Sequence, residues 1–320
     1  MHAPPITPGG DPSTRPTQPI ESIGEIRSPR QIRRARRRLA LQRFWREYRK
    51  SKMGMAGLII LVFFVAVGIF AVFADKSGID PTLTSGPVRA PPSRDYPLGT
   101  DDFGISVLTL VIQGTAISLL VGLTASVITM VIGTLVGIVA GYRGGGIDTF
   151  LMRTTDFALV IPWLALAIVL ASILGPSLVT IILVIGLTSW PSTSRLVRAQ
   201  VLSVRERPYI ERARALGAGS WHMISRHVLP NVTPVILANT VLVVAIAILS
   251  ETALSFLGLG DPQSTSWGGI LEAAFNGSAT TLGNWWWIAS PGVCIVLVVL
   301  SFTMIGFALD EIINPKLRDR

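Results

Sequence analysis

Five long stretches of the chain carry no charged side chain, and they determine the expected architecture. They cover residues 53–74, 103–142, 157–194, 227–250 and 273–309. An uncharged apolar run of about 18 residues or more is long enough to cross the hydrocarbon core of a bilayer as a helix. The pattern therefore predicts an all-α, polytopic membrane protein and excludes a single water-soluble domain.

Turn signals and length divide these stretches into six expected membrane-spanning helices. Gly175-Pro176 is a strong turn signal, so the 157–194 run is expected to give two spans. The 103–142 run is too long for one span, and we expect its first part, 103–115, to lie along or just under the outer surface. The expected spans are 53–73, 116–140, 157–174, 177–194, 232–256 and 291–309.

The segments around these spans give the expected domain organisation. Residues 1–52 are expected to be a disordered, basic N-terminal tail, in which 31–52 can form a helix on the membrane surface or remain a solvated tether. Residues 53–114 hold the first span and an external loop. The five-helix core is expected at 115–311, with a polar loop at 205–230, and a C-terminal tail at 312–320.

The distribution of positive charge orients the spans. The chain has 28 Lys and Arg against 19 Asp and Glu, a net charge of +9, which in a soluble protein would suggest nucleic acid as a partner. All the basic residues except Lys76, Arg89 and Arg94 fall on one side of the six-span topology. Positive loops stay in the cytoplasm. We therefore expect a multi-pass cell-membrane protein with both termini cytoplasmic, which contacts membrane lipid and not nucleic acid.

Two features inside the expected spans carry candidate roles. Gly133, Gly137 and Gly141 repeat every four residues, a spacing that lets two helices approach closely in lipid, within the chain or with a partner. Glu251 is the only acidic residue well inside an expected span, where an ionisable group is costly and often functional. It is a candidate to line a transport path or gate, with a structural hydrogen bond to the following loop as the alternative.

The polar loop before the fifth span is the most distinctive segment, and its sequence at 209–231 is YIERARALGAGSWHMISRHVLPN. Its composition favours helix, Gly217 and Gly219 interrupt it, and Pro230 is expected to stop it. The loop therefore predicts two short helices around a glycine turn, the first amphipathic and able to lie on lipid or dock into a partner's groove. The expected apolar face comprises Ile210, Ala213, Leu216 and Gly217, and the polar face comprises Glu211, Arg212 and Arg214.

The spacing of Glu211, Ala213, Gly217 and Leu229-Pro230 resembles the Glu-Ala-Ala loop of binding-protein-dependent ABC importer permeases. The region from Phe44 to Ala74 is similar to the extra first helix of one branch, the C-type subunit of dipeptide, oligopeptide and nickel permeases. Further motifs similar to that subunit are YPLGTDDFG (96–104), AGYRGGGID (140–148), LTSWPSTSRLVRAQVLSVRERPYIERARALGA (187–218), ETALSFLGLG (251–260) and SWGGIL (266–271). The chain departs from the family pattern at Arg212, His227 and Ile105-Ser106.

The resemblance implies the ABC importer permease fold, with a cytoplasmic coupling helix that transmits the closure of separate ATPase subunits to the membrane helices. Glu211 would pair with a basic residue of the ATPase, and Ala213 and Gly217 would permit close docking. Trp267 would shape an outer vestibule or gate. Leu216, Leu229 and Pro230 complete the expected coupling site.

The resemblance also implies the partners of this chain. These are a homologous B-type permease that shares the translocation pathway, two ABC ATPase subunits, and an extracytoplasmic substrate-binding protein. ATP and Mg²⁺ would be held by the ATPase subunits, because this chain lacks the Gly-x4-Gly-Lys-Ser/Thr phosphate loop. We expect no catalytic, cofactor or metal site in the chain itself.

Several alternatives stay open at this point. Dipeptides and oligopeptides are the expected cargo, with nickel, haem or another small solute as the alternative. A self-contained channel or secondary transporter is a rival class that would move solute without ATPase subunits. A membrane enzyme would need a cluster of His, Asp or Glu within the spans, and the sequence has none.

Overall fold

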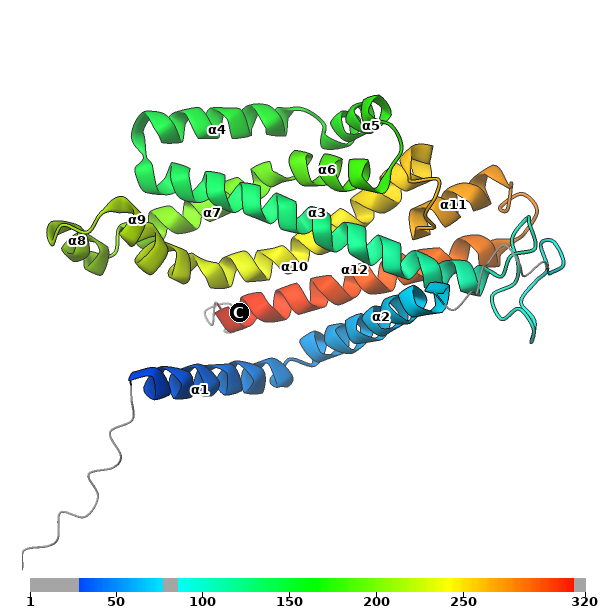
Figure 1. The fold of residues 1–320 in the computed structure, drawn as a ribbon, viewed down its shortest axis with the longest axis horizontal. Helices are drawn as coiled ribbons and strands as arrows, with labels where there is room; N and C mark the ends of the chain where they lie inside the picture. Colours follow the sequence, from blue (N-terminus) through cyan, green and yellow to red (C-terminus); the bar gives the residue numbers. More distant parts are fainter. Residues whose placement is uncertain (1–28, 77–85, 314–320) are drawn as a thin grey trace, which may run out of the picture. The chain divides into compact units, whose positions relative to one another are not determined.

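The computed structural model describes residues 29–76 and 86–313, and most of these residues are helical (Figure 1). Within the described residues the strand-like pairing is limited to one isolated bridge between Thr100 and Ser106. The predicted all-α class is confirmed. The expected tail before residue 29, loop residues 77–85 and the tail from residue 314 lie outside the described residues.

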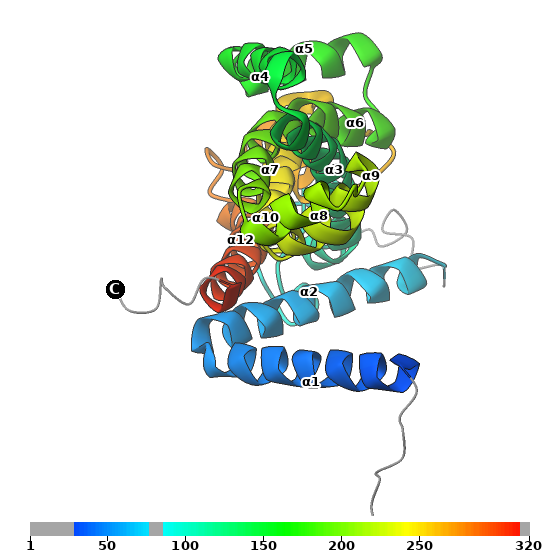
Figure 2. The same ribbon diagram turned by 90° about the vertical axis from the view of Figure 1, so that its left-hand side faces the viewer.

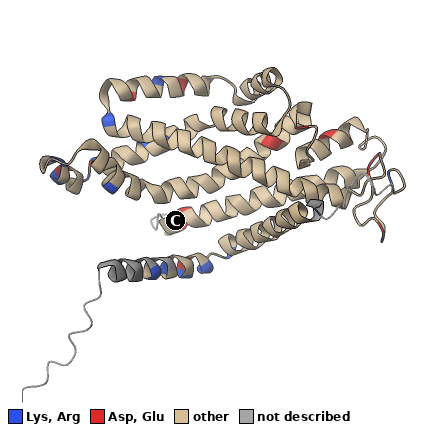
Figure 3. Ribbon diagram, viewed as in Figure 1, with Lys and Arg blue, Asp and Glu red and all other residues tan. Residues whose placement is uncertain are grey.

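Four helical stretches in the described part of the chain are long and apolar enough to cross a bilayer. They contain α2 (Lys52–Lys76), α3 (Val107–Arg143), α10 (Leu229–Leu254) and α12 (Trp285–Ile313), which match the expected first, second, fifth and sixth spans. Helix α3 packs on α7, α10, α6 and α2, and α12 packs on α2 and α10. Charged residues gather toward the ends of these helices (Figure 3).

Helix α3 is one continuous helix of 37 residues, which corrects the expectation that 103–115 lies apart from the second span. At 1.5 Å per residue it is about 55 Å long, whereas the hydrocarbon core of a bilayer is about 30 Å thick. Gly114 lies inside this helix and against an indole ring: a Cβ atom there would be 2.9 Å from Cδ1 of Trp267. A single glycine lowers the stability of a helix without ending it.

The expected third span is broken near its start. Helices α4 (Gly145–Val160) and α5 (Trp163–Leu174) meet at an angle of 85° and count as at most one broken span. Pro162 causes the break because it has no N–H group and holds Ile161 in an extended conformation, with φ −74° and ψ 125°. Figures 1 and 2 show α4 and α5 on the outer side of α6 and α7.

The expected fourth span is also divided. Helix α6 (Leu178–Thr188) ends at Ser189, and α7 (Trp190–Arg205) begins directly after it with Pro191 in its first turn. An 11-residue helix is about 16 Å long, too short to cross the hydrocarbon core alone. The described residues thus contain four candidate spans, or five with the bent pair, so the expected count of six is not confirmed.

Helix α1 (Pro29–Lys50) covers most of residues 31–52, where a surface helix and a solvated tether were the two alternatives, so this part of the N-terminal segment is helical. Proline is well suited to the first helical position, and the Arg, Ala, Leu and Gln residues that follow are strong helix formers. Residues up to Arg46 form a unit of their own, and the remaining elements belong to a second compact unit.

Three groups of buried apolar side chains form the core of the second unit. One surrounds Trp267 and Trp287, where α11 (Trp267–Asn276) meets α3 and α12. A second lies between α3, α5 and α6 around Ile185. The third surrounds Ile210 and Met223, under the polar loop. The loop that carries the resemblance therefore rests on a core of its own.

The glycine stripe of α3 lies against α7. A Cβ atom at Gly137 would be 2.6 Å from the carbonyl oxygen of Ser194 and 2.8 Å from Cβ of Val197. Similar approaches to α7 occur at Gly133, where Thr193 is the neighbour, and at Gly141, where Val201 is the neighbour. The two helix backbones approach more closely here than any side chain would permit.

We predict different effects for two helical glycine substitutions. Gly137→Ala should lower the free energy of unfolding by about 1–3 kcal/mol, because the methyl group overpacks the α3–α7 contact. Gly292→Ala on α12 is the matched control, since a Cβ atom there would meet nothing within 4 Å, and it should be neutral or stabilising by up to about 1 kcal/mol. Thermal unfolding of the purified chain in detergent measures both, and equal effects would contradict the close α3–α7 packing.

Candidate functional site

The polar loop folds into α8 (Pro208–Ala215) and α9 (Ser220–Met223), separated by a glycine turn. Pro208 begins α8, where its missing N–H costs nothing. Ile210 is fully buried and belongs to the same apolar group as Met223 and Val228. One apolar side chain of α8 therefore fixes this short helix to the segments on either side.

Gly217 ends α8 in a Schellman motif. The N–H of Ala218 donates to the carbonyl oxygen of Ala213 at 3.1 Å, and the N–H of Gly217 donates to that of Arg214 at 2.9 Å. Gly217 has a φ of 87°, a left-handed conformation that is strained for residues with a side chain. A Cβ atom at Gly217 would meet nothing within 4 Å. The positive φ angle therefore favours glycine at this position, whereas no neighbouring atom of this chain would clash with a side chain there.

The outward surface of the loop is formed by Glu211, Leu216, Gly217 and Trp221. Leu216 is 89% exposed, which corrects its expected place on the apolar face beside Ile210. The correction follows from the helix end, because α8 stops at Ala215 and Leu216 is its C-cap. Within the described residues no ion pair joins Glu211 to another side chain. Sequence reasoning missed Trp221, which is also exposed.

The expected helix stop at Pro230 is wrong. Pro230 lies in the first turn of α10, and the helical path continues from Ser220 to Leu259. A π-helical turn at Ile224–Val228 leads into α10, and the N–H of Leu229 donates to the carbonyl oxygen of Ile224. This wider turn accommodates Pro230, which has no N–H to donate to the preceding turn. Leu229 and Pro230 are both exposed, so the helical path joins the loop directly to a candidate membrane span.

His227, one of the departures from the family pattern, lies in an aromatic group. Its ring centroid is 5.8 Å from that of His222 and 6.2 Å from that of Tyr209. These rings link α8 to the π-helical turn. Within the described residues no three His, Cys, Asp or Glu side chains form a group that could hold a metal ion.

Glu251 is 1% exposed and lies in a hydroxyl network. Ser255 donates to Oε1 at 2.8 Å, and Ser118 on α3 donates to Oε2 at 3.1 Å. The Oγ of Ser118 also accepts a hydrogen bond from the N–H of Trp267 at 3.2 Å. Glu251 thus joins α3, α10 and the start of α11, so the geometry favours the structural alternative over a path-lining role.

Trp267 is fully buried, so in this structure it does not line an open vestibule. Its Nε1–H donates to the carbonyl oxygen of Val111 at 3.1 Å, and its ring meets Phe64 edge-on with centroids 5.7 Å apart. The indole fills the junction of α2, α3 and α11 that Gly114 leaves open. Its contacts here are those of a packing residue.

Asp101 is the second carboxylate removed from solvent. Its Oδ1 accepts hydrogen bonds from the N–H groups of Phe103 and Ile105, at 2.9 and 2.7 Å, which fixes the turn before α3. Burial raises the pKa of this carboxyl above its ordinary value, partly offset by the two backbone donors. Trp286 on α12 donates to the carbonyl oxygen of Thr100, so the loop before α3 is tied to the start of α12.

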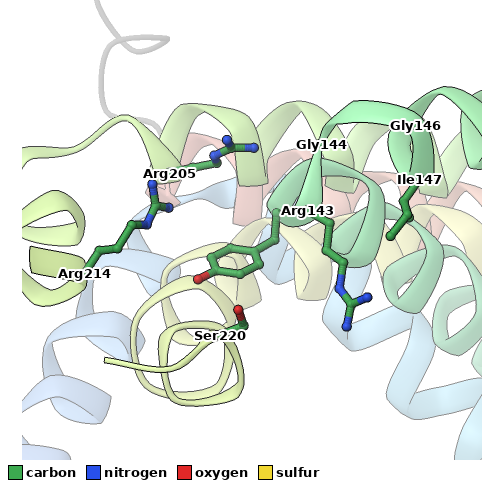
Figure 4. A pocket seen from close by; sticks show the side chains of 8 residues that line it. Arg143, Gly144, Gly146, Ile147, Arg205, Arg214 and Ser220 are labelled. Atoms are coloured by element: carbon green, nitrogen blue, oxygen red, sulfur yellow. The ribbon is translucent and has the colours of Figure 1, made fainter. Parts of the chain in front are cut away.

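A cavity of about 650 Å³, largely open to the surface, lies where the ends of α3 and α7 meet the starts of α4 and α9. Three arginines line it, Arg143, Arg205 and Arg214 (Figure 4). Beside it, Arg198 on α7 forms a bidentate ion pair with Asp148 on α4, with N–O distances of 2.6 and 2.7 Å. Sequence reasoning missed this cavity because its residues come from four separate segments.

Comparisons with known proteins give two family matches. Residues 133–319 match the model of the binding-protein-dependent transport system inner membrane component, and residues 40–92 match the N-terminal transmembrane domain of oligopeptide transport permease C. The chain is 38% identical over 262 residues to the dipeptide transport system permease protein DppC of Bacillus subtilis, covering 81% of this chain and 80% of that protein.

Two further relatives are similar over most of their length. The probable D,D-dipeptide transport system permease protein DdpC of Escherichia coli is 36% identical, with 81% of this chain and 86% of the relative covered. A putative peptide permease protein of Brucella suis is 38% identical, with 72% and 76% covered. The similarity therefore includes the polar loop and the apolar helices on both sides of it.

We predict that Glu251→Ala lowers the free energy of unfolding by about 1–3 kcal/mol, because it leaves the buried hydroxyls of Ser118 and Ser255 without their acceptor. Glu251→Gln, which keeps an acceptor oxygen, should lose less. Glu272→Ala on α11 is the control, since Glu272 is part-exposed. Denaturant unfolding in detergent measures all three. A Glu251→Ala variant as stable as the wild type would contradict the structural role.

Proposed function

Because this chain belongs to the family of binding-protein-dependent transport system inner membrane components, we propose that it is the permease subunit of an ATP-driven importer of dipeptides or oligopeptides. The names of the relatives, which are dipeptide and peptide permeases, support this class of cargo. Nickel, haem or another small solute is the alternative cargo. The binding protein of the system would select among them.

The coupling site of the proposal is the exposed surface of α8 and its glycine turn. Ile210 anchors α8 from inside, while Glu211 and Leu216 face outward without a partner among the described residues. An apolar side chain that is 89% exposed beside a carboxylate suits a docking helix that enters a groove of a partner. This outward position of Leu216 is the observation that carries the proposal.

The route of coupling follows the chain. Ala213 and Gly217 would let the ATPase approach the α8 backbone, and Glu211 would pair with a basic residue there. Leu229 and Pro230 lie where the loop enters α10, so a displacement of α8 would be passed to α10 and, through the α3–α7 contact, to the membrane helices. This is a rigid-body switch driven from one site and read at another.

The proposal assigns the remaining parts of the transporter to partners. A homologous B-type permease would complete the translocation pathway, two ABC ATPase subunits would bind ATP and Mg²⁺, and an extracytoplasmic binding protein would deliver the solute. Both termini and the polar loop of this chain would lie in the cytoplasm, as its positive charge suggests. The chain itself would hold no cofactor.

The exposed leucine gives the sharpest test of docking. Leu216→Ser should abolish solute uptake and release the ATPase subunits during purification, because it removes the apolar contact without disturbing the fold of this chain. Leu216→Met, which keeps apolar volume, should retain both properties. Co-purification of the ATPases and uptake in cells measure the effect. Full ATPase association by Leu216→Ser would contradict this docking surface.

A second pair of variants separates the backbone role of Gly217 from docking. Asparagine tolerates the left-handed conformation better than leucine, so a purely conformational role predicts that Gly217→Asn works and Gly217→Leu fails. Close docking predicts that both variants insert in the membrane but lose ATPase association.

Uptake by this chain alone in vesicles, without ATPases, would overturn the proposed function in favour of a self-contained transporter.

A further inference from the structure

We propose that the arginine-lined cavity between α3, α4, α7 and α9 binds the phosphate of an anionic phospholipid headgroup. Its volume of about 650 Å³ lies within the range of sites for small molecules. The proposal concerns a lipid site on this chain and does not depend on which solute the transporter carries.

The charge of the cavity is unbalanced. Within the described residues, Arg143, Arg205 and Arg214 have no carboxylate within ion-pair distance. The nearby Asp148 is already held by Nε and Nη2 of the Arg198 guanidinium. Arg205 donates to the carbonyl oxygen of Gly141, at 3.3 Å. Three cations around one cavity favour an anion, and the planar guanidinium group suits phosphate oxygens.

The side chains approach the cavity from different elements. Figure 4 shows Arg214 extending from α8 toward the segment of α7 that carries Arg205, while Arg143 lies on the side of Ile147 and α4. Gly144 and Gly146, which also line the cavity, belong to the start of α4, whose first N–H groups have no intrahelical acceptor. These N–H groups would add donors to those of the arginines.

The position of the cavity points to a lipid. Arg143 is the last residue of α3, a candidate membrane span, and it follows the expected span 116–140 by three residues. The cavity therefore lies at the end of a span, where headgroups are found. Basic pockets between helices on the cytoplasmic side are suited to anionic headgroups. A lipid at this place would have its phosphate among the arginines and its chains in the bilayer.

An apolar strip runs from the cavity along α4. Ile147 lines the cavity, and Phe150 and Phe157, at 70% and 71% exposed, follow it at helical spacing on the same face. Thr155 is the buried residue of α4, so most of this helix lacks cover from the rest of the chain. Charge next to an exposed apolar strip fits an amphipathic ligand better than a free phosphate or an acidic protein segment.

A bound headgroup would tie the coupling helix to the membrane helices. Arg214 lies on α8, Arg205 at the end of α7 and Arg143 at the end of α3, so a headgroup bound in the cavity would contact elements that the proposed switch must move together. Anionic lipid would then stabilise one position of α8 relative to α3. The ligand would act as a structural lipid of the coupling site.

The test is lipid retention by the full-length chain. The purified chain in detergent is titrated with phosphatidylglycerol or phosphatidylcholine, and bound lipid is measured by native mass spectrometry. The double variant Arg143→Gln/Arg214→Gln should bind phosphatidylglycerol at least about tenfold more weakly, because two charge-assisted contacts are lost. The matched control Arg153→Gln/Arg212→Gln removes the same charge from α4 and α8 outside the cavity, and it should bind like the wild type.

Three other outcomes would overturn the proposal. Equal loss in the test and control variants, or equal binding of the two lipids, would show a non-specific charge effect. Displacement of phosphatidylglycerol by equimolar inorganic phosphate would show a free-phosphate site. Unchanged lipid binding by the test variant together with loss of ATPase co-purification would show that the arginines meet an acidic protein surface. Normal ATPase association with lost lipid binding would support the lipid site independently of the coupling proposal.

Discussion

The close contact between α3 and α7 is the constraint on which the rest of the structure depends. Three glycines remove every side chain from one stripe of α3, so that backbone atoms of α7 reach distances that a methyl group would forbid. In lipid, where burial of apolar surface gives little association energy, such backbone proximity and the hydrogen bonds around it hold helices together. The end of α7 leads into α8, and α3 ends beside it. The polar loop is therefore attached to a closely packed pair of helices.

This attachment would let the proposed coupling helix act on the membrane helices. Ile210 fastens α8 to the apolar group beneath it, and the π-helical turn and Pro230 carry the chain into α10 without a flexible linker. At the opposite end of α10, Glu251 and its serines bind α3 and the start of α11. A rigid connection thus extends from the loop to the far end of the helix. Rigid elements with two arrangements are what transmit a conformational switch.

The sequence predicts the features that depend on residues close together along the chain. Charge-free runs located the four long helices, and Gly217 predicted the turn that ends α8. Two local signals were overlooked: Pro162 bends the third span, and Leu216 faces outward because α8 ends at Ala215. Long-range packing, such as that of Trp267 against Gly114 of α3, lay beyond sequence reasoning. Pro230 was wrongly expected to end a helix, because the sequence does not show the π-helical turn that precedes it and leads into α10. The serines that donate to Glu251 and the arginines that line the cavity come from segments far apart in the sequence. No spacing within a single segment therefore predicts that they meet.

The most direct test of the central claim is the location of Leu216. Cys294 is the single cysteine of the chain, so Leu216→Cys in a Cys294→Ala background gives one exposed thiol. The account predicts that a membrane-impermeant maleimide labels it in inside-out vesicles and not in right-side-out vesicles, and that bound ATPase subunits protect it. Labelling from the outer side, or equal labelling with and without the ATPases, would contradict the account.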